Sequence, residues 1–238
     1  LLEAERLGRQ VSADRWLFRD LNISLAAGEQ LALQGASGVG KSTLLNLLAG
    51  LDQADEGRIS FDGRNVTGLA PHRLTRLGMG RTFQITRVFH GMTVLENVQV
   101  ALCAHAQQTW KVWTAASGLH VQRAKDLLER VGLAAQWART ARTLAHGDQK
   151  RLELAIALAS QPKLLLLDEP LGALDPLNRV SLQEEMKTIF SQLGKTVVLV
   201  THDMGEAASL ADLIVIMKDG YSSFYPNNDR QILALKSA

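Results

Sequence analysis

The stretch that decides the fold lies at residues 35–42 and reads Gly35-Ala36-Ser37-Gly38-Val39-Gly40-Lys41-Ser42. It matches the pattern G-x-x-x-x-G-K-[ST] at every defined position. The pattern before it, at Gln30–Leu33, predicts a strand, and the pattern of Lys41–Ala49 predicts a helix that ends at Gly50. Such a loop directs backbone N–H groups at phosphate oxygens, and the helix adds its positive N-terminal end. The sequence therefore predicts a P-loop that binds nucleotide phosphates.

Three side chains at the end of this loop have expected roles. Lys41 is expected to reach the β- and γ-phosphates, and the Ser42 hydroxyl is expected to ligate Mg²⁺. Thr43 follows directly and is expected to contact the nucleotide as well. The alternative is a glycine-rich turn that matches by chance, which the flanking strand and helix disfavour.

An acidic pair follows a second predicted strand. Leu164–Leu167 is a run of four leucines that leads into Asp168-Glu169-Pro170. An aspartate at the end of a buried strand can hold Mg²⁺ through water, and an adjacent glutamate can deprotonate the attacking water. A solvated acidic pair is the alternative reading. The four leucines favour the functional one, because ligands of open α/β sheets bind at the carboxyl ends of their strands.

Length and composition limit the class of protein. A chain of 238 residues fits one α/β domain, or a core with an inserted subdomain. The net charge of +2 is small, so no nucleic-acid partner is expected. Cys103 is the single cysteine, which excludes an internal disulfide. No run approaches the ~18 apolar residues of a spanning helix, so any membrane part is expected to come from a partner.

The first half of the chain shows further local patterns. Residues 21–25 alternate apolar and polar side chains, which predicts a half-buried strand. Asp62-Gly63 between residues 58–61 and 65–66 predicts a hairpin. Thr93-Val-Leu-Glu96 is a capping box that opens a helix. The N-terminal part therefore carries antiparallel strands beside the P-loop, and a helical stretch follows.

Helices and strands alternate in the second half of the chain. Apolar spacing predicts a helix from Val121 to Val131 that ends at Gly132, and another from Leu182 to Leu193 that ends at Gly194. Strands are predicted at Val197–Val200 and Leu213–Met217. This alternation is typical of a parallel sheet that is covered on both faces.

Six markers in this order resemble the nucleotide-binding domain of ABC ATPases over about residues 11 to 220. They are the P-loop, Gln84 in Arg81-Thr82-Phe83-Gln84, the segment 144–149, Asp168-Glu169, Leu174-Asp175 and His202. The resemblance implies a P-loop NTPase with a RecA-like α/β core, an antiparallel β-subdomain and an inserted helical subdomain. It implies one ABC ATPase domain over residues 1–238. The core and β-subdomain would occupy about 1–86 and 161–238, and the helical subdomain about 87–160.

Three roles follow from the resemblance alone. Gln84 looks like the Q-loop glutamine that touches Mg²⁺ or its water, although a surface glutamine would look the same. Asp175, in Gly172-Ala-Leu-Asp175, looks like the D-loop residue at a dimer interface and can also cap the helix that follows. His202 follows a predicted strand and looks like the switch histidine that contacts the γ-phosphate, where a lone histidine is more often structural.

The chain departs from the family pattern in two places. The usual signature Leu-Ser-Gly-Gly-Gln reads here Leu144-Ala145-His146-Gly147-Asp148-Gln149. Ala145 lacks the hydroxyl that would bond the γ-phosphate of a second subunit, and Asp148 adds negative charge, so a weakened contact across the dimer is expected. Gly147 and the helix predicted at 149–159 still offer N–H groups. An aromatic residue that stacks on adenine is usual near Ser12, and the nearby Trp16 is interpreted as a strand residue.

The resemblance implies a cytoplasmic ATPase that is peripheral on the inner membrane and drives transmembrane permease subunits. It would form a head-to-tail dimer, with itself or a paralogous ATPase subunit, around two ATP molecules with Mg²⁺. Each site would combine Lys41, Ser42, Gln84, Asp168, Glu169 and His202 of one chain with residues 145–148 of the other. The alternatives are a non-transport ABC ATPase of DNA repair or translation, which usually has a long coiled coil or two fused halves, and a binding module with a dead site.

Subfamily signals are mixed. Residues 83–97 and 145–149 resemble branched-chain amino-acid importer ATPases, and residues 168–176 and 194–204 resemble glycine-betaine importer ATPases. Residues 45–52 are similar to lipoprotein-release exporter ATPases. The cargo is therefore not predicted. The apolar cluster Ile85, Val88, Phe89 and Met92 is predicted to meet the membrane partner, with burial in the protein's own core as the alternative.

Overall fold

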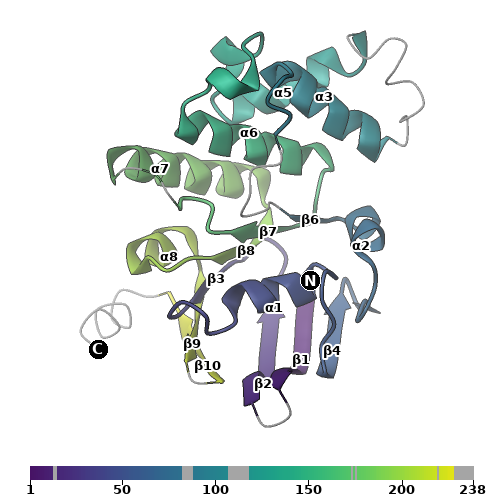
Figure 1. Ribbon diagram of the computed structural model, residues 1–238, viewed down its shortest axis with the longest axis vertical. Helices are drawn as coiled ribbons and strands as arrows, with labels where there is room; N and C mark the ends of the chain where they lie inside the picture. The colour runs from purple at the N-terminus through teal and green to yellow at the C-terminus, as the bar shows by residue number, and fades with distance from the viewer. Residues whose placement is uncertain are drawn as a thin grey trace.

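A six-stranded sheet forms the centre of the molecule (Figure 1). The computed structural model describes residues 1–12, 15–81, 88–106, 118–172, 174, 176–218 and 220–227. In spatial order, the strands are β10 (Tyr221–Pro226), β9 (Leu213–Lys218), β3 (Gln30–Gln34), β8 (Thr196–Val200), β7 (Leu164–Asp168) and β6 (Met79–Arg81). The strands from β9 to β6 are parallel, and β10 pairs antiparallel with β9. The predicted parallel sheet and the P-loop NTPase fold are confirmed.

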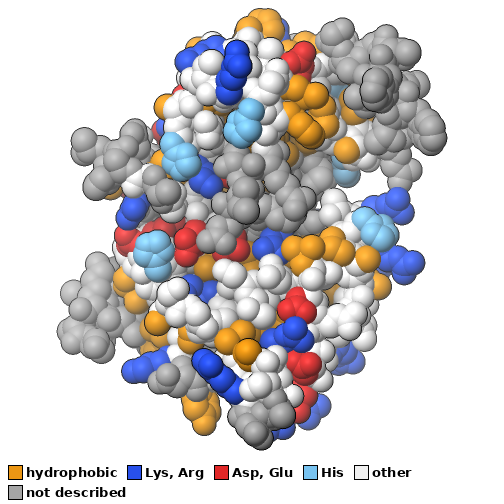
Figure 2. Space-filling view, viewed as in Figure 1, with side chains coloured by type: hydrophobic (Ala, Val, Ile, Leu, Met, Phe, Trp, Pro, Cys, Tyr) orange, Lys and Arg blue, Asp and Glu red, His pale blue; other side chains and the backbone are white. Residues whose placement is uncertain are grey.

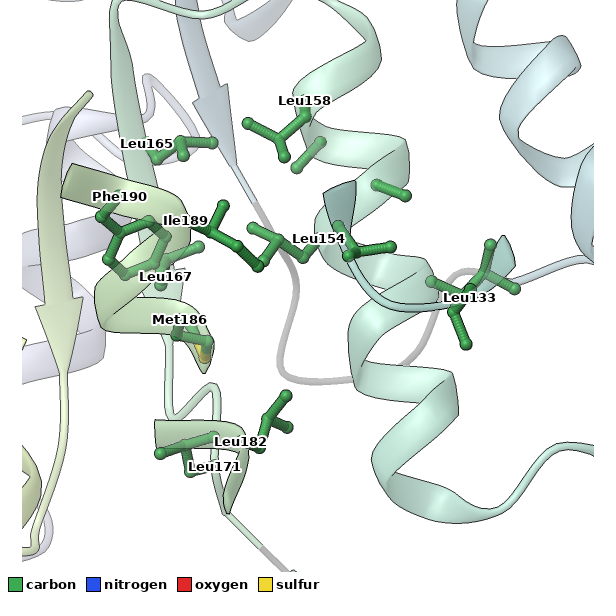
Figure 3. Packing of buried hydrophobic residues seen from close by; sticks show 14 of the residues in the cluster. Leu133, Leu154, Leu158, Leu165, Leu167, Leu171, Leu182, Met186, Ile189 and Phe190 are labelled. Atoms are coloured by element: carbon green, nitrogen blue, oxygen red, sulfur yellow. The ribbon is translucent and has the colours of Figure 1, made fainter. Parts of the chain in front are cut away.

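The central strands are buried on both faces, as their continuous apolar sequences predict. In β7, Leu164 and Leu166 belong to one hydrophobic cluster, while Leu165 and Leu167 belong to another. The first cluster includes the buried face of α1 (Lys41–Leu48) and a second sheet, and the second includes α7 (Pro176–Leu193) and α8 (Met204–Leu210). Figure 3 shows Leu167 beside Phe190 on α7, with Leu154 of α6 beyond.

A four-stranded antiparallel sheet lies beside α1, at the bottom of Figure 1. Its order is β2-β1-β4-β5, formed by β2 (Arg15–Leu25), β1 (Leu2–Ser12), β4 (Glu56–Phe61) and β5 (Arg64–Asn65). The predicted hairpin is confirmed, because Phe61 pairs with Arg64 across Asp62-Gly63. The predicted strand at 21–25 is the second half of β2, and Trp16 lies in the same strand, as expected.

Three helices pack together at the far end of the molecule from this sheet (Figure 1). They are α3 (Val94–His105), α5 (Val121–Arg130) and α6 (His146–Ala159). The predicted capping box opens α3: Glu96 N donates to Thr93 Oγ1 at 3.1 Å, and Thr93 N donates to Glu96 Oε2 at 2.7 Å. In the described parts of residues 87–160 there is no strand, as predicted.

The central sheet and the three helices meet where α6 packs on α7 and on β6, and α2 (Pro71–Leu77) packs on β6 as well. Three leucine-rich elements, β7, α6 and α7, share one hydrophobic cluster, so the helical part is continuous with the core. None of the described helices has the length and hydropathy needed to cross a bilayer.

Candidate active site

The P-loop joins the carboxyl end of β3 to α1, as the sequence predicts. Gly40 is the N-cap of α1 and has a φ of 109°, which a residue with a side chain adopts only at a cost. At Gly35 a Cβ would lie 2.4 Å from the Met217 carbonyl oxygen. These two glycines let the loop curl beside β9 and place the first N–H groups of α1 at its centre.

Lys41 points back into this loop. Its Nζ donates to the carbonyl oxygens of Gly35 at 2.6 Å and Ala36 at 2.8 Å. Burial lowers the pKa of the Lys41 ammonium, while the charges of Glu169 and Asp168 act in the opposite direction. The loop therefore holds a desolvated cation next to two carboxylates, in the position expected for a phosphate-binding lysine.

Ser42 and Asp168 meet across the gap between α1 and β7. The Ser42 Oγ donates to Asp168 Oδ1 at 3.2 Å, and Arg81 Nη2 lies 3.6 Å from Asp168 Oδ2. Burial raises the pKa of the Asp168 carboxyl, and the Ser42 hydrogen bond and the Arg81 charge partly offset this effect. A hydroxyl and a carboxylate at this spacing are the hard oxygen ligands that Mg²⁺ prefers, so the residues fit the metal.

Glu169 and His202 stand at the ends of β7 and β8. Their side chains approach at 3.6 Å between Glu169 Oε1 and His202 Nδ1. Glu169 has a φ of 45°, a conformation that side-chain residues adopt mainly where the surrounding structure forces it. Its N–H donates to the Val200 carbonyl at 3.0 Å, and the His202 carbonyl accepts from Gln34 Nε2 at 3.2 Å. Backbone contacts to neighbouring strands therefore fix both residues.

Lys41, Ser42, Glu169 and His202 border one hollow of about 330 Å³. It is lined by Leu17, Ser37, Gly38, Gly40, Lys41, Ser42, Thr43, Glu169 and His202. Figure 2 shows a band of acidic side chains at mid-height on the left of the molecule, with a histidine beside it. The structure thus brings together the P-loop, the acidic pair and the predicted switch histidine, which come from three separate parts of the sequence.

Two predicted site residues, Gln84 and Asp175, lie outside the described residues. The signature segment is described, and it begins α6, with Ala145 as the N-cap. Ala145, His146, Gly147 and Asp148 are absent from the lining of the hollow at the P-loop. One chain therefore does not place its own signature segment in its own phosphate site.

Asp148 is held by a cation that the sequence analysis did not consider. Arg151 Nη1 lies 2.6 Å from Asp148 Oδ1, and the same guanidinium makes two hydrogen bonds of 2.7 and 2.8 Å to Glu185 on α7. Gln136 Nε2 also donates to Asp148 at 3.4 Å. The Asp148 carboxylate, expected to oppose the nucleotide, thus has a cation partner that it shares with Glu185.

Leu17 is the lining residue that sequence reasoning missed. A Cβ on Gly40 would lie 2.7 Å from Leu17 Cγ, so Leu17 packs directly on the loop. Trp16 does not line the hollow, and its ring stacks on the Arg19 guanidinium at 4.6 Å. Strand alternation could have identified Leu17, because neighbours in a strand point to opposite faces.

Comparisons with known proteins agree with this geometry. Residues 18–172 match the family described as ABC transporter. The sulfate/thiosulfate import ATP-binding protein CysA 2 of Chromobacterium violaceum is 41% identical over 199 residues, which cover 84% of this chain and 51% of that protein. The aliphatic sulfonates import ATP-binding protein SsuB of Pseudomonas entomophila is 38% identical, with coverage of 89% and 71%. The chain thus spans about half the length of the first relative.

A solved structure has the same fold. The dimeric ATP-binding cassette MJ0796 in a post-hydrolysis state, bound to ADP and Pi, superposes with a TM-score of 0.78 at 27% identity. The alignment covers 96% of this chain and 99% of that one. The similarity therefore extends over the central sheet, the antiparallel sheet and the helical part together.

Proposed function

Because this chain belongs to the ABC transporter family, we propose that it binds and hydrolyses ATP and thereby drives a membrane transport partner. One observation carries the proposal: Lys41, Ser42 and the Glu169–His202 pair line a single hollow, and Ser42 is hydrogen-bonded to Asp168. A binding module without hydrolytic activity would not need the Glu169–His202 pair. The DNA-repair or translation alternative is not favoured, because the relatives described above are import proteins.

Each residue has a distinct task in the proposed reaction. Lys41 and the N–H groups of residues 35–43 bind the phosphates and balance the charge that develops on them. Ser42 and Asp168, together with Gln84, would hold Mg²⁺, which supplies a Lewis acid at the phosphate oxygens. Glu169 accepts a proton from the attacking water, and His202 orients the terminal phosphate.

The second chain would supply the remaining contact. We infer that Ala145–Asp148 of a partner copy, or of a paralogous ATPase subunit, faces the nucleotide through the N–H groups at the start of α6. Asp175 would lie at the same interface. The dimeric MJ0796 cassette supports this arrangement, because it has the same fold.

The membrane partner would dock beside α2 and α3. A hollow of about 670 Å³ lies here, and its apolar lining includes Leu51, Leu74, Ala101 and Ile156. In Figure 2 apolar side chains gather at mid-height near α2. We infer that transmembrane permease subunits bind here and hold the chain on the cytoplasmic face of the membrane. Residues 87–160 would move as a helical subdomain against the core formed by 1–86 and 161–238.

The residues predicted to contact the membrane partner, within 85–92, differ in their exposure to solvent. Phe89 and Met92 are exposed by 54% and 37%, whereas Val88 is buried, and Ile85 lies outside the described residues. Phe89 and Met92 are therefore the crosslinking positions we propose. Crosslinks from these two positions should reach a permease subunit in an assembled transporter, and crosslinks from the exposed Tyr221 should not.

Phosphate release by the purified chain tests the proposed reaction. We expect ATP turnover that requires Mg²⁺ and stops when the metal is chelated. Binding of ATP with no turnover, in the presence of a membrane partner as well, would contradict it. The cargo is not assigned, because the relatives serve different cargoes. The likeness to amino-acid and betaine importers remains a prediction.

A further inference from the structure

A single arginine connects two segments that border the active site. Arg179 Nη2 donates to the Leu174 carbonyl at 3.2 Å, and Arg179 Nη1 lies 3.3 Å from Asp203 Oδ2. Leu174 belongs to the segment 172–175 that we place at the dimer interface. Asp203 directly follows His202. The guanidinium therefore connects an interface segment to the residue that follows the switch histidine.

Asp203 is held firmly on its other side. Its Oδ1 accepts from Gly205 N at 2.7 Å and Glu206 N at 3.1 Å, which caps α8. Its own N–H donates to Thr201 Oγ1 at 3.0 Å. The hydrogen bond from Glu206 N lowers the pKa of the Asp203 carboxyl, so it stays ionised opposite Arg179. Asp203 is therefore linked to groups on both sides of His202, the Thr201 hydroxyl and the first N–H groups of α8.

The hydrogen-bond network ends at a buried carboxyl. Thr201 Oγ1 donates to Glu206 Oε2 at 2.6 Å. Among the described residues, Glu206 Oε1 and Arg179 Nε are buried and have no hydrogen-bond partner. Unsatisfied buried polar atoms of charged groups reduce stability, and where they persist they call for an explanation other than stability. Apolar side chains would fill this space at a lower cost.

We propose that Arg179 is a positioning residue that sets His202 against Glu169 and transmits to it the position of the segment 172–175. The guanidinium is planar and rigid, so it can hold a carbonyl and a carboxylate at a fixed separation. Docking of a second chain on the segment 172–175 shifts the Leu174 carbonyl. Arg179 and Asp203 then carry that shift to the imidazole, which lies 3.6 Å from Glu169. This inference rests on the proposed ATP hydrolysis.

Three substitutions in the full chain test it. Arg179→Met should lower kcat by about 10- to 100-fold, because a misplacement of roughly 1 Å in an active site can cost that much. ATP affinity and the thermal midpoint should change little. Arg179→Lys keeps the charge but lacks the planar guanidinium that bonds two acceptors at once, so kcat should recover in part. Lys187→Met removes a cation from an exposed position on the same helix and should leave kcat unchanged.

A second background separates positioning from general structure. In a His202→Ala chain, Arg179→Met should cause no further loss of kcat, since its effect passes through His202. Equal losses in both backgrounds, or an unchanged kcat in the Arg179→Met chain, would overturn the inference. If Arg179→Met unfolds, Arg179→Lys in both backgrounds gives the same comparison. A native chain that fails to hydrolyse ATP overturns the proposed function itself, so the two failures are distinct.

Discussion

Two clusters of charged residues differ in how closely their side chains contact one another. Near the P-loop, Ser42, Asp168, Glu169 and His202 make contacts of 3.2 to 3.6 Å, and burial shifts the pKa of Asp168. At the junction of α6 and α7, Arg151 contacts its two carboxylates at 2.6 to 2.8 Å. Arg151 thus makes the short, paired contacts that are typical of a structural ion pair. In the first cluster the carboxylates of Asp168 and Glu169 face the cations Lys41 and Arg81, and the contacts between side chains are longer. Lys41, Glu169 and His202 line a hollow that can admit a ligand.

The largest expected effect is the loss of the P-loop cation. Lys41→Ala should abolish turnover and weaken ATP binding by on the order of 2–3 kcal/mol, since a charge-assisted contact to phosphate is lost. Lys163→Met is the matched control, because Lys163 forms an exposed ion pair with Asp62. Phosphate release and nucleotide titration measure both variants. Unchanged turnover in Lys41→Ala would show that the first cluster does not bind phosphate.

The second effect distinguishes the glutamates of the two clusters. Glu169→Gln should slow hydrolysis by roughly 10²–10⁴ with ATP binding intact, because glutamine cannot accept the proton. Glu185→Gln, in the second cluster, should retain turnover within a few-fold. Single-turnover hydrolysis measures both. Equal losses in the two variants would remove the distinction between the clusters.

Glu206 lies behind the first cluster, and its pKa predicts a pH effect. Burial is the main cause that raises the pKa of its carboxyl from 4.5 to about 7. Between these values the folded chain holds a proton that the unfolded chain releases, so stability falls as pH rises from about 4.5 to 7. The stability of the Glu206→Gln chain relative to the native chain should therefore increase between pH 5 and pH 8, by at most roughly 3 kcal/mol. Urea denaturation at both pH values measures it, and a pH-independent difference would contradict the assignment.

A smaller effect is expected at the second cluster. Arg151→Met should reduce the free energy of unfolding by about 1–2 kcal/mol, because two partly exposed carboxylates lose their partner. ATP affinity of the single chain should stay the same. Urea denaturation and nucleotide titration test the two halves of this statement, and a loss of affinity equal to that in Lys41→Ala would contradict it.

Long periodic elements and motifs could be predicted from the sequence, and irregular elements could not. Strand β1 was not predicted, because register shifts after Ala4 and Leu7 break its alternation. Helix α2 has one buried residue, Leu74, and so shows no apolar face. Strand β6 has only three residues and includes Gly80. Which residues of such segments are buried depends on partners that are distant in the sequence, so the local pattern of apolar residues does not predict these elements.

The residues of the P-loop site could be predicted because each is coupled to a local pattern. Glycines mark the loop, a leucine run leads to Asp168 and Glu169, and a valine-rich strand leads to His202. The charge environment of Asp148 was missed. Asp148 was expected to repel a nucleotide, but Arg151 lies three residues further along α6 and pairs with it, a spacing that the sequence shows. The contact of Arg151 with Glu185 on α7 depends on the tertiary fold and could not be predicted.

The central claim is that two chains complete each nucleotide site, and sedimentation of the Glu169→Gln chain with Mg-ATP tests it most directly. We expect a dimer that forms with ATP, weakly and at high protein concentration, since Ala145 lacks a hydroxyl. Adding Ala145→Ser should strengthen it, because a hydrogen bond to a charged group contributes about 1.5–3 kcal/mol. If both chains stay monomeric over a wide concentration range while binding ATP, the claim is wrong for this chain.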